Sequence, residues 1–135
     1  MSVRRASDFY PTPIPVIKNF LDNHAIKEGN ILEPCAGNGN IIVALKERYN
    51  NHITAIEIRD EKDNLQHSGA DEILIEDFLN YCPAKEYKTI ISNPPFSLAT
   101  EVINKCFEIA CADTEIIMLL RLAFLEAERR YKFWQ

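Results

Sequence analysis

The chain has 135 residues, the size of one domain, and its 47% hydrophobic and 26% charged residues are usual for a soluble globular protein. The formal net charge is −5, and residues 31–120 carry seven basic against fifteen acidic side chains, which argues against a strong non-specific DNA binder. No apolar run approaches the roughly 20 residues that span a membrane, and no apolar segment typical of a secretory signal follows the charged N-terminus. We therefore expect one cytoplasmic domain over residues 1–135, without membrane contact.

The predicted elements alternate between helix and strand along the chain. Thr12 as N-cap and Pro13 as first helical residue predict a helix that ends near residue 24. Its apolar stripe consists of Val16, Ile17, Phe20 and Leu21. Strands are predicted at 30–34, 52–58, 71–77, 87–93 and 114–122. Further helices are predicted at 37–49, at 97–111 and within 126–134.

This alternation predicts an α/β fold with a parallel sheet that is covered on both faces. The apolar run at 116–120, "IIMLL", is typical of a strand buried on both sides. In open sheets of this kind, ligands bind beyond the carboxyl ends of the strands, near the point where the strand order reverses. The residues that directly follow each strand are therefore the candidate site.

The four cysteines of the chain do not form a metal or disulfide framework. None of Cys35, Cys82, Cys106 and Cys111 stands in a CxxC pattern, and no pair of histidines lies nearby at ligand spacing. We expect reduced thiols and no metal site.

A glycine-containing turn, "EPCAGNGN", follows the first predicted strand. Gly37 and Gly39 allow a tight turn and a close approach of the backbone to a ligand, although two glycines in such a turn are also ordinary turn chemistry. The third glycine of a dinucleotide fingerprint is missing, which disfavours a nicotinamide dehydrogenase, and the turn lacks the lysine of a phosphate-binding P-loop. The carboxylate of Glu33 would repel a pyrophosphate but attract an ammonium or sulfonium group.

Acidic side chains end the second and third predicted strands. Glu57 follows Glu33 by 24 residues, close to the spacing at which an acid holds ribose hydroxyls; the alternative is a solvated surface charge. Asp77 could accept a hydrogen bond from an exocyclic amine, and Phe78 could lie against a flat ring. The alternative for this pair is a helix cap beside a core aromatic.

A rigid corner, "SNPPF", follows the fourth predicted strand. Pro94 and Pro95 fix the backbone and remove two amide donors. The side-chain oxygen of Asn93 and the carbonyl of Pro94 are then two fixed acceptors, which suit an –NH₂ group, while Phe96 offers a face to a planar ring. Holding both hydrogens orients the nitrogen lone pair and offsets the charge that develops on it, without a general base.

These motifs, in this order, resemble class I S-adenosylmethionine-dependent methyltransferases, above all N6-adenine DNA methyltransferases of the compact phage and prophage type. "EPCAGNGN", the acid at Glu57, "EDF" and "SNPPF" carry the resemblance, and "DFYPTP" ahead of the glycine turn strengthens it. The resemblance covers about residues 8–130 and implies a Rossmann-like sandwich with a mostly parallel sheet. It implies transfer of a methyl group from S-adenosyl-L-methionine to the N6 of a flipped-out adenine in DNA.

The resemblance also assigns roles to individual residues. Around the cofactor it implies Glu33, Cys35, Gly37 and Gly39 at the methionine end, Glu57 on the ribose, Ile58 on the adenine, Asp77 on the adenine amine, Phe78 beside it, and Tyr10, Thr12 and Pro13 closing the pocket. In the catalytic corner it implies Asn93 and Pro94 on the substrate amine, stiffened by Pro95, and Phe96 stacked on the target base.

One feature of the family has no counterpart in this sequence. The family sheet has seven strands, the last two forming an edge hairpin, whereas this chain ends at "YKFWQ" soon after the fifth predicted strand. We expect the hairpin to be lacking and the fifth strand to present an edge that could pair two chains in a homodimer.

Three other interpretations stay open. The same corner accommodates guanine N2 of structured RNA or a glutamine side chain of a protein, although "DFYPTP" favours DNA. A third interpretation is a non-catalytic module that binds the cofactor or a partner. Arg129 and Arg130 could contact DNA phosphates or lie on a solvated helix face.

Overall fold

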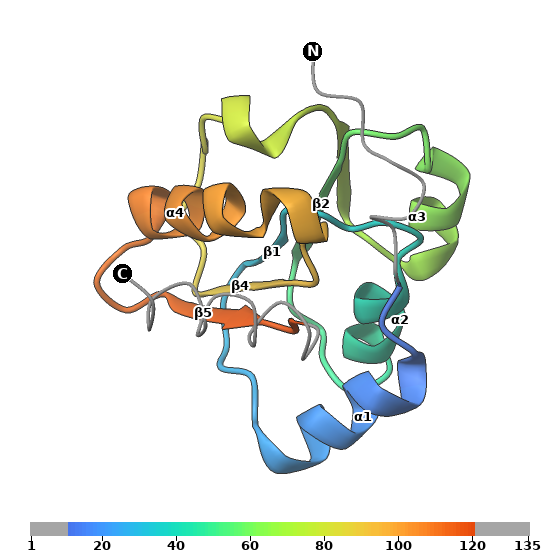
Figure 1. The fold of residues 1–135 in the computed structure, drawn as a ribbon. Coiled ribbons are helices and arrows are strands. Elements are labelled where there is room, and N and C mark those ends of the chain that lie inside the picture. The colour runs from blue at the N-terminus through green and yellow to red at the C-terminus, as the bar shows by residue number, and fades with distance from the viewer. Residues whose placement is uncertain (1–10, 121–135) are drawn as a thin grey trace, which may run out of the picture.

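A five-stranded parallel sheet forms the centre of the protein (Figure 1). The computed structural model describes residues 11–120. The strand order is β3-β2-β1-β4-β5, and all four neighbouring pairs are parallel. The strands are β1 (Ile31–Glu33), β2 (Ile53–Glu57), β3 (Glu72–Ile75), β4 (Thr89–Ser92) and β5 (Glu115–Met118). This arrangement confirms the predicted Rossmann-like α/β fold.

Helices cover both faces of the sheet (Figure 1). The helices are α1 (Ile14–Asn23), α2 (Asn40–Lys46), α3 (Lys62–Ser68) and α4 (Ala99–Ile109), with short 3-10 turns η2 (Phe78–Asn80) and η3 (Phe96–Leu98). One core cluster joins α1, α2 and α3 to strand residues such as Ile31 and Ile53. The second core cluster joins α4 to the strand residues that are next in sequence, such as Leu32. It lies on the other face of the sheet, because successive side chains of a strand point to opposite faces. The strand order reverses between β1 and β4, where this topology places a ligand crevice.

The start of α1 differs from the prediction. The N-cap position is Pro13, which makes no side-chain capping bond, and the helix begins at Ile14, so the predicted N-cap role of Thr12 is wrong. The Thr12 carbonyl instead accepts a hydrogen bond of 3.0 Å from the side chain of Asn40, at the start of α2. Pro15 lies in the first turn, where the missing N–H costs no helical bond.

Helix α3 was not among the predicted elements, and β5 is less buried than predicted. Leu65 is the single buried apolar residue of α3, too little for an amphipathic stripe. The left-handed Gly69 that ends the helix, with φ of 95°, was the available signal. In β5 only Ile117 is buried, because β5 has a single neighbour, β4, within residues 11–120.

Some expectations fall outside the described residues: Tyr10, the helix within 126–134, Arg129 and Arg130, and any edge hairpin beyond β5. Within residues 11–120, no helix combines the length and apolar composition needed to cross a bilayer.

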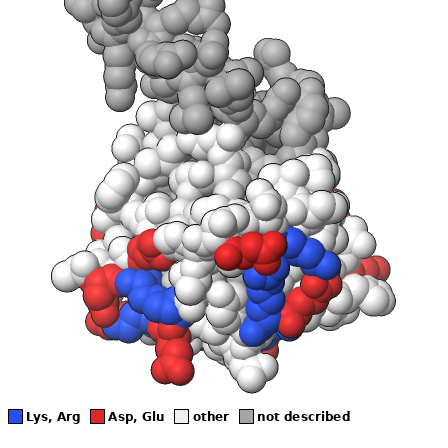
Figure 2. Space-filling model, turned by 90° about the horizontal axis from the view of Figure 1, so that it is seen from below, with Lys and Arg blue, Asp and Glu red and all other residues white. Residues whose placement is uncertain are grey.

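Basic and acidic side chains lie next to one another on the face seen from below, without a field of one sign (Figure 2). Ion pairs of the described chain include Lys46–Asp71 at 2.6 Å and Arg48–Asp22 at 2.5 Å. Such paired charges contribute little to stability when exposed, and the described residues on this face form no purely basic patch for phosphates.

The carboxylate of Asp71 connects α2 to β2. It accepts from Lys46 Nζ at 2.6 Å and from the Ile53 N–H at 2.9 Å. Partial burial alone would raise the pKa of Asp71, but the bonds from Lys46 and Ile53 and the charge of Lys46 outweigh burial and lower this pKa below its usual value. The stabilisation is therefore present above the unfolded-state pKa of about 3.9 and is lost as the pH falls through the lower folded-state pKa.

Asp71→Asn is expected to lower the free energy of unfolding by about 0.5–1 kcal/mol at pH 7, a size that reflects the partial exposure of the pair. Urea unfolding of the wild-type protein and of Asp71→Asn, repeated in steps from pH 7 to pH 3.5, measures this loss. The difference in free energy of unfolding between the two proteins should narrow below about pH 4. A difference that stays constant over this range would contradict the role of the ionised carboxylate.

Candidate functional site

The turn between β1 and α2 depends on two glycines with positive φ. Gly37 has φ of 56° and Gly39 has φ of 91°. The Gly37 N–H donates to Glu57 Oε1 at 2.9 Å, which joins the turn to the end of β2. A Cβ on Gly39 would lie 2.7 Å from the Cβ of Ser68 in α3. Gly39 is thus required for close packing of α2 on α3, a different reason from the close approach to a ligand that the sequence suggested.

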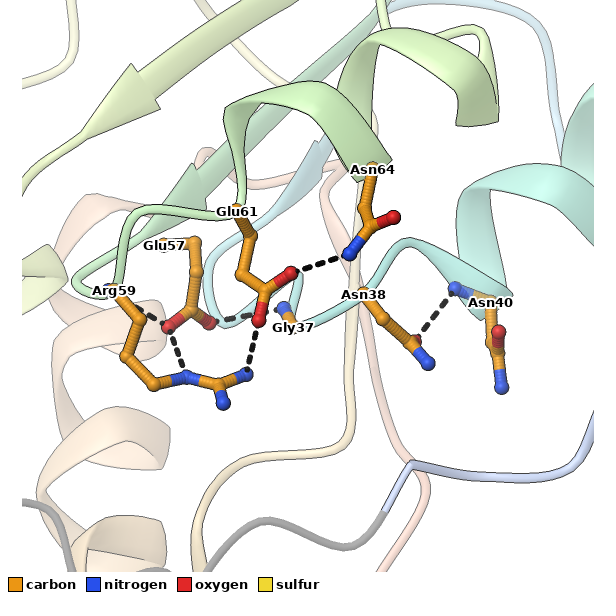
Figure 3. A network of polar contacts seen from close by, with 7 residues as sticks. All are labelled: Gly37, Asn38, Asn40, Glu57, Arg59, Glu61 and Asn64. Atoms are coloured by element: carbon orange, nitrogen blue, oxygen red, sulfur yellow. Dashed lines mark hydrogen bonds and ion pairs between the residues drawn. The ribbon is translucent and has the colours of Figure 1, made fainter.

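The Glu57 carboxylate is buried, with 1% of the residue exposed, so the alternative of a solvated surface charge is wrong. Its Oε2 accepts from the backbone N–H of Arg59 at 3.0 Å and from Arg59 Nε at 3.1 Å (Figure 3). These bonds and the Gly37 bond fix the plane of the carboxylate at the carboxyl end of β2.

The Glu33 carboxylate links the ends of β1 and β4. This residue is 1% exposed, and its Oε2 accepts from the Cys35 N–H at 2.7 Å and from Ser92 Oγ at 3.0 Å. Ser92 directly precedes Asn93. The glycine turn and the proline corner are therefore joined by a buried hydrogen bond across the point where the strand order reverses.

A small cavity brings together five of the predicted cofactor residues. Its lining includes Cys35, Glu57, Ile58, Asp77 and Phe78, and its volume of about 30 Å³ holds only a water or two. A purine ring is larger, so the side chains around the cavity must move apart to admit one.

Asp77 and Phe78 also have the structural roles that the sequence left open, a helix cap and a core aromatic. Asp77 Oδ1 accepts from the Leu79 N–H at 3.0 Å and caps η2, and Phe78 is 3% exposed. Ile58, by contrast, is 43% exposed. The cap and the core aromatic are thus part of the cavity wall, and Ile58 offers an apolar surface beside it.

A larger cavity lies beside the proline corner. Its volume is about 370 Å³, within the range of small-molecule sites. Its lining is Pro11, Thr12, Pro13, Val16, Asn93, Leu119 and Leu120. The structure therefore brings Thr12 and Pro13 together with Asn93, although they lie far apart in the sequence. Pro94 and Pro95 are buried, and Phe96 is 42% exposed.

Arg59 and Ser92 contact the candidate site residues Glu57 and Glu33, and the sequence pointed to neither contact. Each neighbours a residue that was singled out: Arg59 follows Glu57 by two positions, and Ser92 precedes Asn93. Their contacts depend on which elements lie side by side, and sequence spacing alone does not give that information. The described residues contain no group of three or more His, Cys, Asp or Glu side chains that could hold a metal ion.

The four cysteines are free thiols in different environments. Cys106 of α4 is buried, and burial together with the nearby charge of Glu33 raises its pKa to about 12. Because the thiolate is the reactive form, a brief iodoacetamide treatment of the native protein at pH 8 is expected to label the exposed Cys82 and to leave Cys106 unmodified. Peptide mass spectrometry measures the labelling of each cysteine. After prior denaturation, Cys82 and Cys106 should be labelled to the same extent. Rapid labelling of native Cys106 would contradict the packing of α4 on the sheet.

The sheet order β3-β2-β1-β4-β5, the glycine turn after β1 and the buried acid at the end of β2 are an arrangement that class I S-adenosylmethionine-dependent methyltransferases share with other Rossmann-like proteins. The chain belongs to the methyltransferase small domain family, which matches residues 16–113.

Individual relatives agree with this family. The chain is 28% identical over 120 residues to the type II methyltransferase M.CvrRI of Paramecium bursaria Chlorella virus XZ-6E, a match that covers 73% of this chain and 32% of that protein. This chain thus spans about a third of the length of that relative.

Solved structures with the same fold include two methyltransferases. An RNA methyltransferase from Salinibacter ruber in complex with S-adenosyl-L-homocysteine superposes with a TM-score of 0.64 at 18% identity, over 81% of this chain and 76% of that one. The ribosomal protein L11 methylase from Lactobacillus delbrueckii subsp. bulgaricus gives a TM-score of 0.69 at 14% identity, and the match covers 87% of this chain and 65% of that one. At these identities the likeness establishes the fold.

Proposed function

We propose that this chain binds S-adenosyl-L-methionine and transfers its methyl group to an amino nitrogen, the N6 of adenine in DNA. The observation that carries the proposal is the position of Asn93: it lines the 370 Å³ cavity with Thr12 and Pro13. Ser92, directly before it, is bonded to Glu33 at the end of β1. A rigid amide thus stands next to the turn that binds the donor in this class.

The residues around the glycine turn fit the cofactor. The buried carboxylate of Glu57 suits ribose hydroxyls, and the exposed Ile58 and the buried Phe78 supply apolar surface for an adenine. Asp77 lines the same cavity and is the candidate acceptor for the adenine amine. Tyr10, Thr12 and Pro13 are the candidates for closing the pocket. When bound, the cofactor supplies an electrophilic methyl group on a sulfonium.

The methionine end of the cofactor belongs, in this proposal, to the turn after β1. The candidates are Glu33, Cys35 and Gly37, with Gly39 contributing through the packing of α2 on α3. The negative charge of Glu33 favours a nearby ammonium or sulfonium group over a phosphate.

The proline corner holds the acceptor nitrogen. The Asn93 side-chain oxygen and the Pro94 carbonyl accept the two hydrogens of an –NH₂ group, so the nitrogen lone pair is aimed along one direction. Both oxygens also stabilise the positive charge that develops on nitrogen as it gains a carbon and before it loses a proton. Pro95 stiffens the corner, and Phe96, at 42% exposure, offers a ring face to a flipped-out base.

Two observations favour DNA: the "DFYPTP" segment before the glycine turn, and the similarity to a type II methyltransferase. RNA is the second candidate, with guanine N2 as the target, because RNA methyltransferases are among the proteins of similar fold. The proposal includes a cytoplasmic location. It also includes pairing of two chains through the β5 edge, and light scattering in solution tests this pairing.

The test is a methylation assay with tritiated S-adenosyl-L-methionine and three substrates: DNA free of methyladenine, ribosomal RNA, and release factor as a protein glutamine substrate. The expected product is N6-methyladenine in digested DNA. Label in guanine of RNA or in glutamine would replace the DNA proposal. No label in any substrate, together with no calorimetric binding of the cofactor by a folded chain, would favour a non-catalytic module.

A further inference from the structure

The guanidinium of Arg59 lies against the buried carboxylate of Glu57 (Figure 3). The Glu57 side chain is 0% exposed and the Arg59 side chain 32% exposed. Arg59 donates twice to Glu57 Oε2, from its backbone N–H at 3.0 Å and from Nε at 3.1 Å. Its Nη2 lies 3.5 Å from Glu61 Oε1, and Asn64 Nδ2 donates to Glu61 Oε2 at 2.7 Å. A polar chain therefore runs from the Gly37 turn through Glu57 and Arg59 to α3.

This arrangement provides what a buried carboxylate needs in order to stay ionised and fixed. Burying a charge is unfavourable unless the charge is paired and hydrogen-bonded. The guanidinium of Arg59 forms the ion pair with Glu57 and supplies the opposite charge. Bonds from Gly37 and from Arg59 reach different oxygens of Glu57, so rotation of the carboxylate is restricted.

The two side chains differ in their relation to the cofactor cavity. Glu57 is one of the residues that line the 30 Å³ cavity, whereas Arg59 lines neither that cavity nor the 370 Å³ one. Arg59 can therefore influence a ligand there through Glu57 without itself lining the cavity.

We propose that Arg59 is a positioning residue for the cofactor ribose: it keeps Glu57 ionised and oriented to accept ribose hydroxyls. The inference rests on the proposed function, because it takes Glu57 as the ribose ligand. Lysine does not replace arginine fully at such a site, because it lacks the fork that reaches both Glu57 and Glu61.

Arg48 provides a matched control. Its side chain is 31% exposed, close to the 32% of Arg59, and it also pairs with a carboxylate, that of Asp22. The Asp22 side chain is 61% exposed, however, and the pair links the turn that follows α2 to α1. Arg48→Met therefore removes an arginine ion pair of similar exposure without affecting Glu57.

The experiment is calorimetric titration of the wild-type protein, Arg59→Met, Arg59→Lys and Arg48→Met with S-adenosylhomocysteine and with its 2′,3′-dideoxy analogue. For S-adenosylhomocysteine we expect affinity to fall about tenfold in Arg59→Met, the size of one hydrogen bond to a charged group, and about threefold in Arg59→Lys. Arg48→Met should stay within about twofold of wild type. For the dideoxy analogue all variants should bind within about twofold of wild type, because no hydroxyl remains for Glu57 to accept.

Each outcome of the titration either supports or overturns the role of Arg59. Unchanged affinity of both Arg59 variants for S-adenosylhomocysteine, or an equal loss for both ligands, overturns the role of Arg59 and leaves the proposed function standing. If Arg59→Met does not fold, Arg59→Lys retains the charge and provides the same comparison. A wild-type protein that is folded and binds neither ligand overturns the proposed function as well.

Discussion

Asn93→Ala is expected to reduce methyl transfer by about 10²- to 10³-fold, the usual cost of removing one group that stabilises developing charge in an active site. The affinity for S-adenosylhomocysteine should stay within about twofold, because the amide oxygen is proposed to contact the substrate amine. Asn93 is partly exposed and lines a cavity, so its truncation leaves no buried void. Single-turnover transfer of a tritiated methyl group and calorimetry measure the two quantities separately.

Asn104→Ala is the control for this experiment. Asn104 is exposed on α4, and its loss should change neither quantity. If Asn93→Ala retained transfer within a few-fold of wild type, the amine-holding role of the corner would be wrong. A parallel loss of cofactor affinity would mean that the amide belongs to the donor site.

Gly39→Ala is expected to lower the free energy of unfolding by about 3 kcal/mol, whereas Gly69→Ala should cost about 1 kcal/mol. Both glycines have nearly the same positive φ, 91° and 95°, so the backbone strain of an alanine is shared. The new methyl group meets different atoms, because Gly39 faces the Cβ of Ser68 at 2.7 Å and Gly69 faces the flexible Lys46 Cγ at 3.3 Å. The difference between the variants therefore measures the close approach of α2 to α3.

Urea unfolding of the three proteins at pH 7 provides this comparison. Equal losses in the two variants would show that the glycine turn is constrained by its φ angle alone. Cofactor affinity, measured on the folded fraction of Gly39→Ala, should change less than stability. A loss of affinity with unchanged stability would restore a direct contact between ligand and Gly39.

The sequence predicted the sheet well because β1, β2 and β4 are buried on both faces and consist, apart from their last residues, of apolar or β-branched residues. It failed for α3, where Leu65 alone is buried among apolar residues, so helical periodicity has nothing to repeat. It also overestimated the burial of β5, because the apolar run at 116–120 does not reveal that β5 has only one neighbour within the described chain.

The sequence predicted which residues lie together at the carboxyl edge of the sheet. Glu33 and Glu57 end β1 and β2, and Asn93 directly follows β4, so the parallel strands bring all three residues to one edge of the sheet. The supporting contacts were not predictable. The bond between Ser92 and Glu33 joins residues 59 positions apart, and it exists because β4 lies beside β1.

A crystal structure of the chain with S-adenosylhomocysteine tests the proposed methyl-transfer site most directly. We expect the ligand sulfur to lie between the Gly37 turn and the Asn93 amide, with the ribose on Glu57 and the Asn93 oxygen facing the 370 Å³ cavity. A ligand bound away from the glycine turn, or an Asn93 amide turned into the core of the sheet, would contradict this expectation.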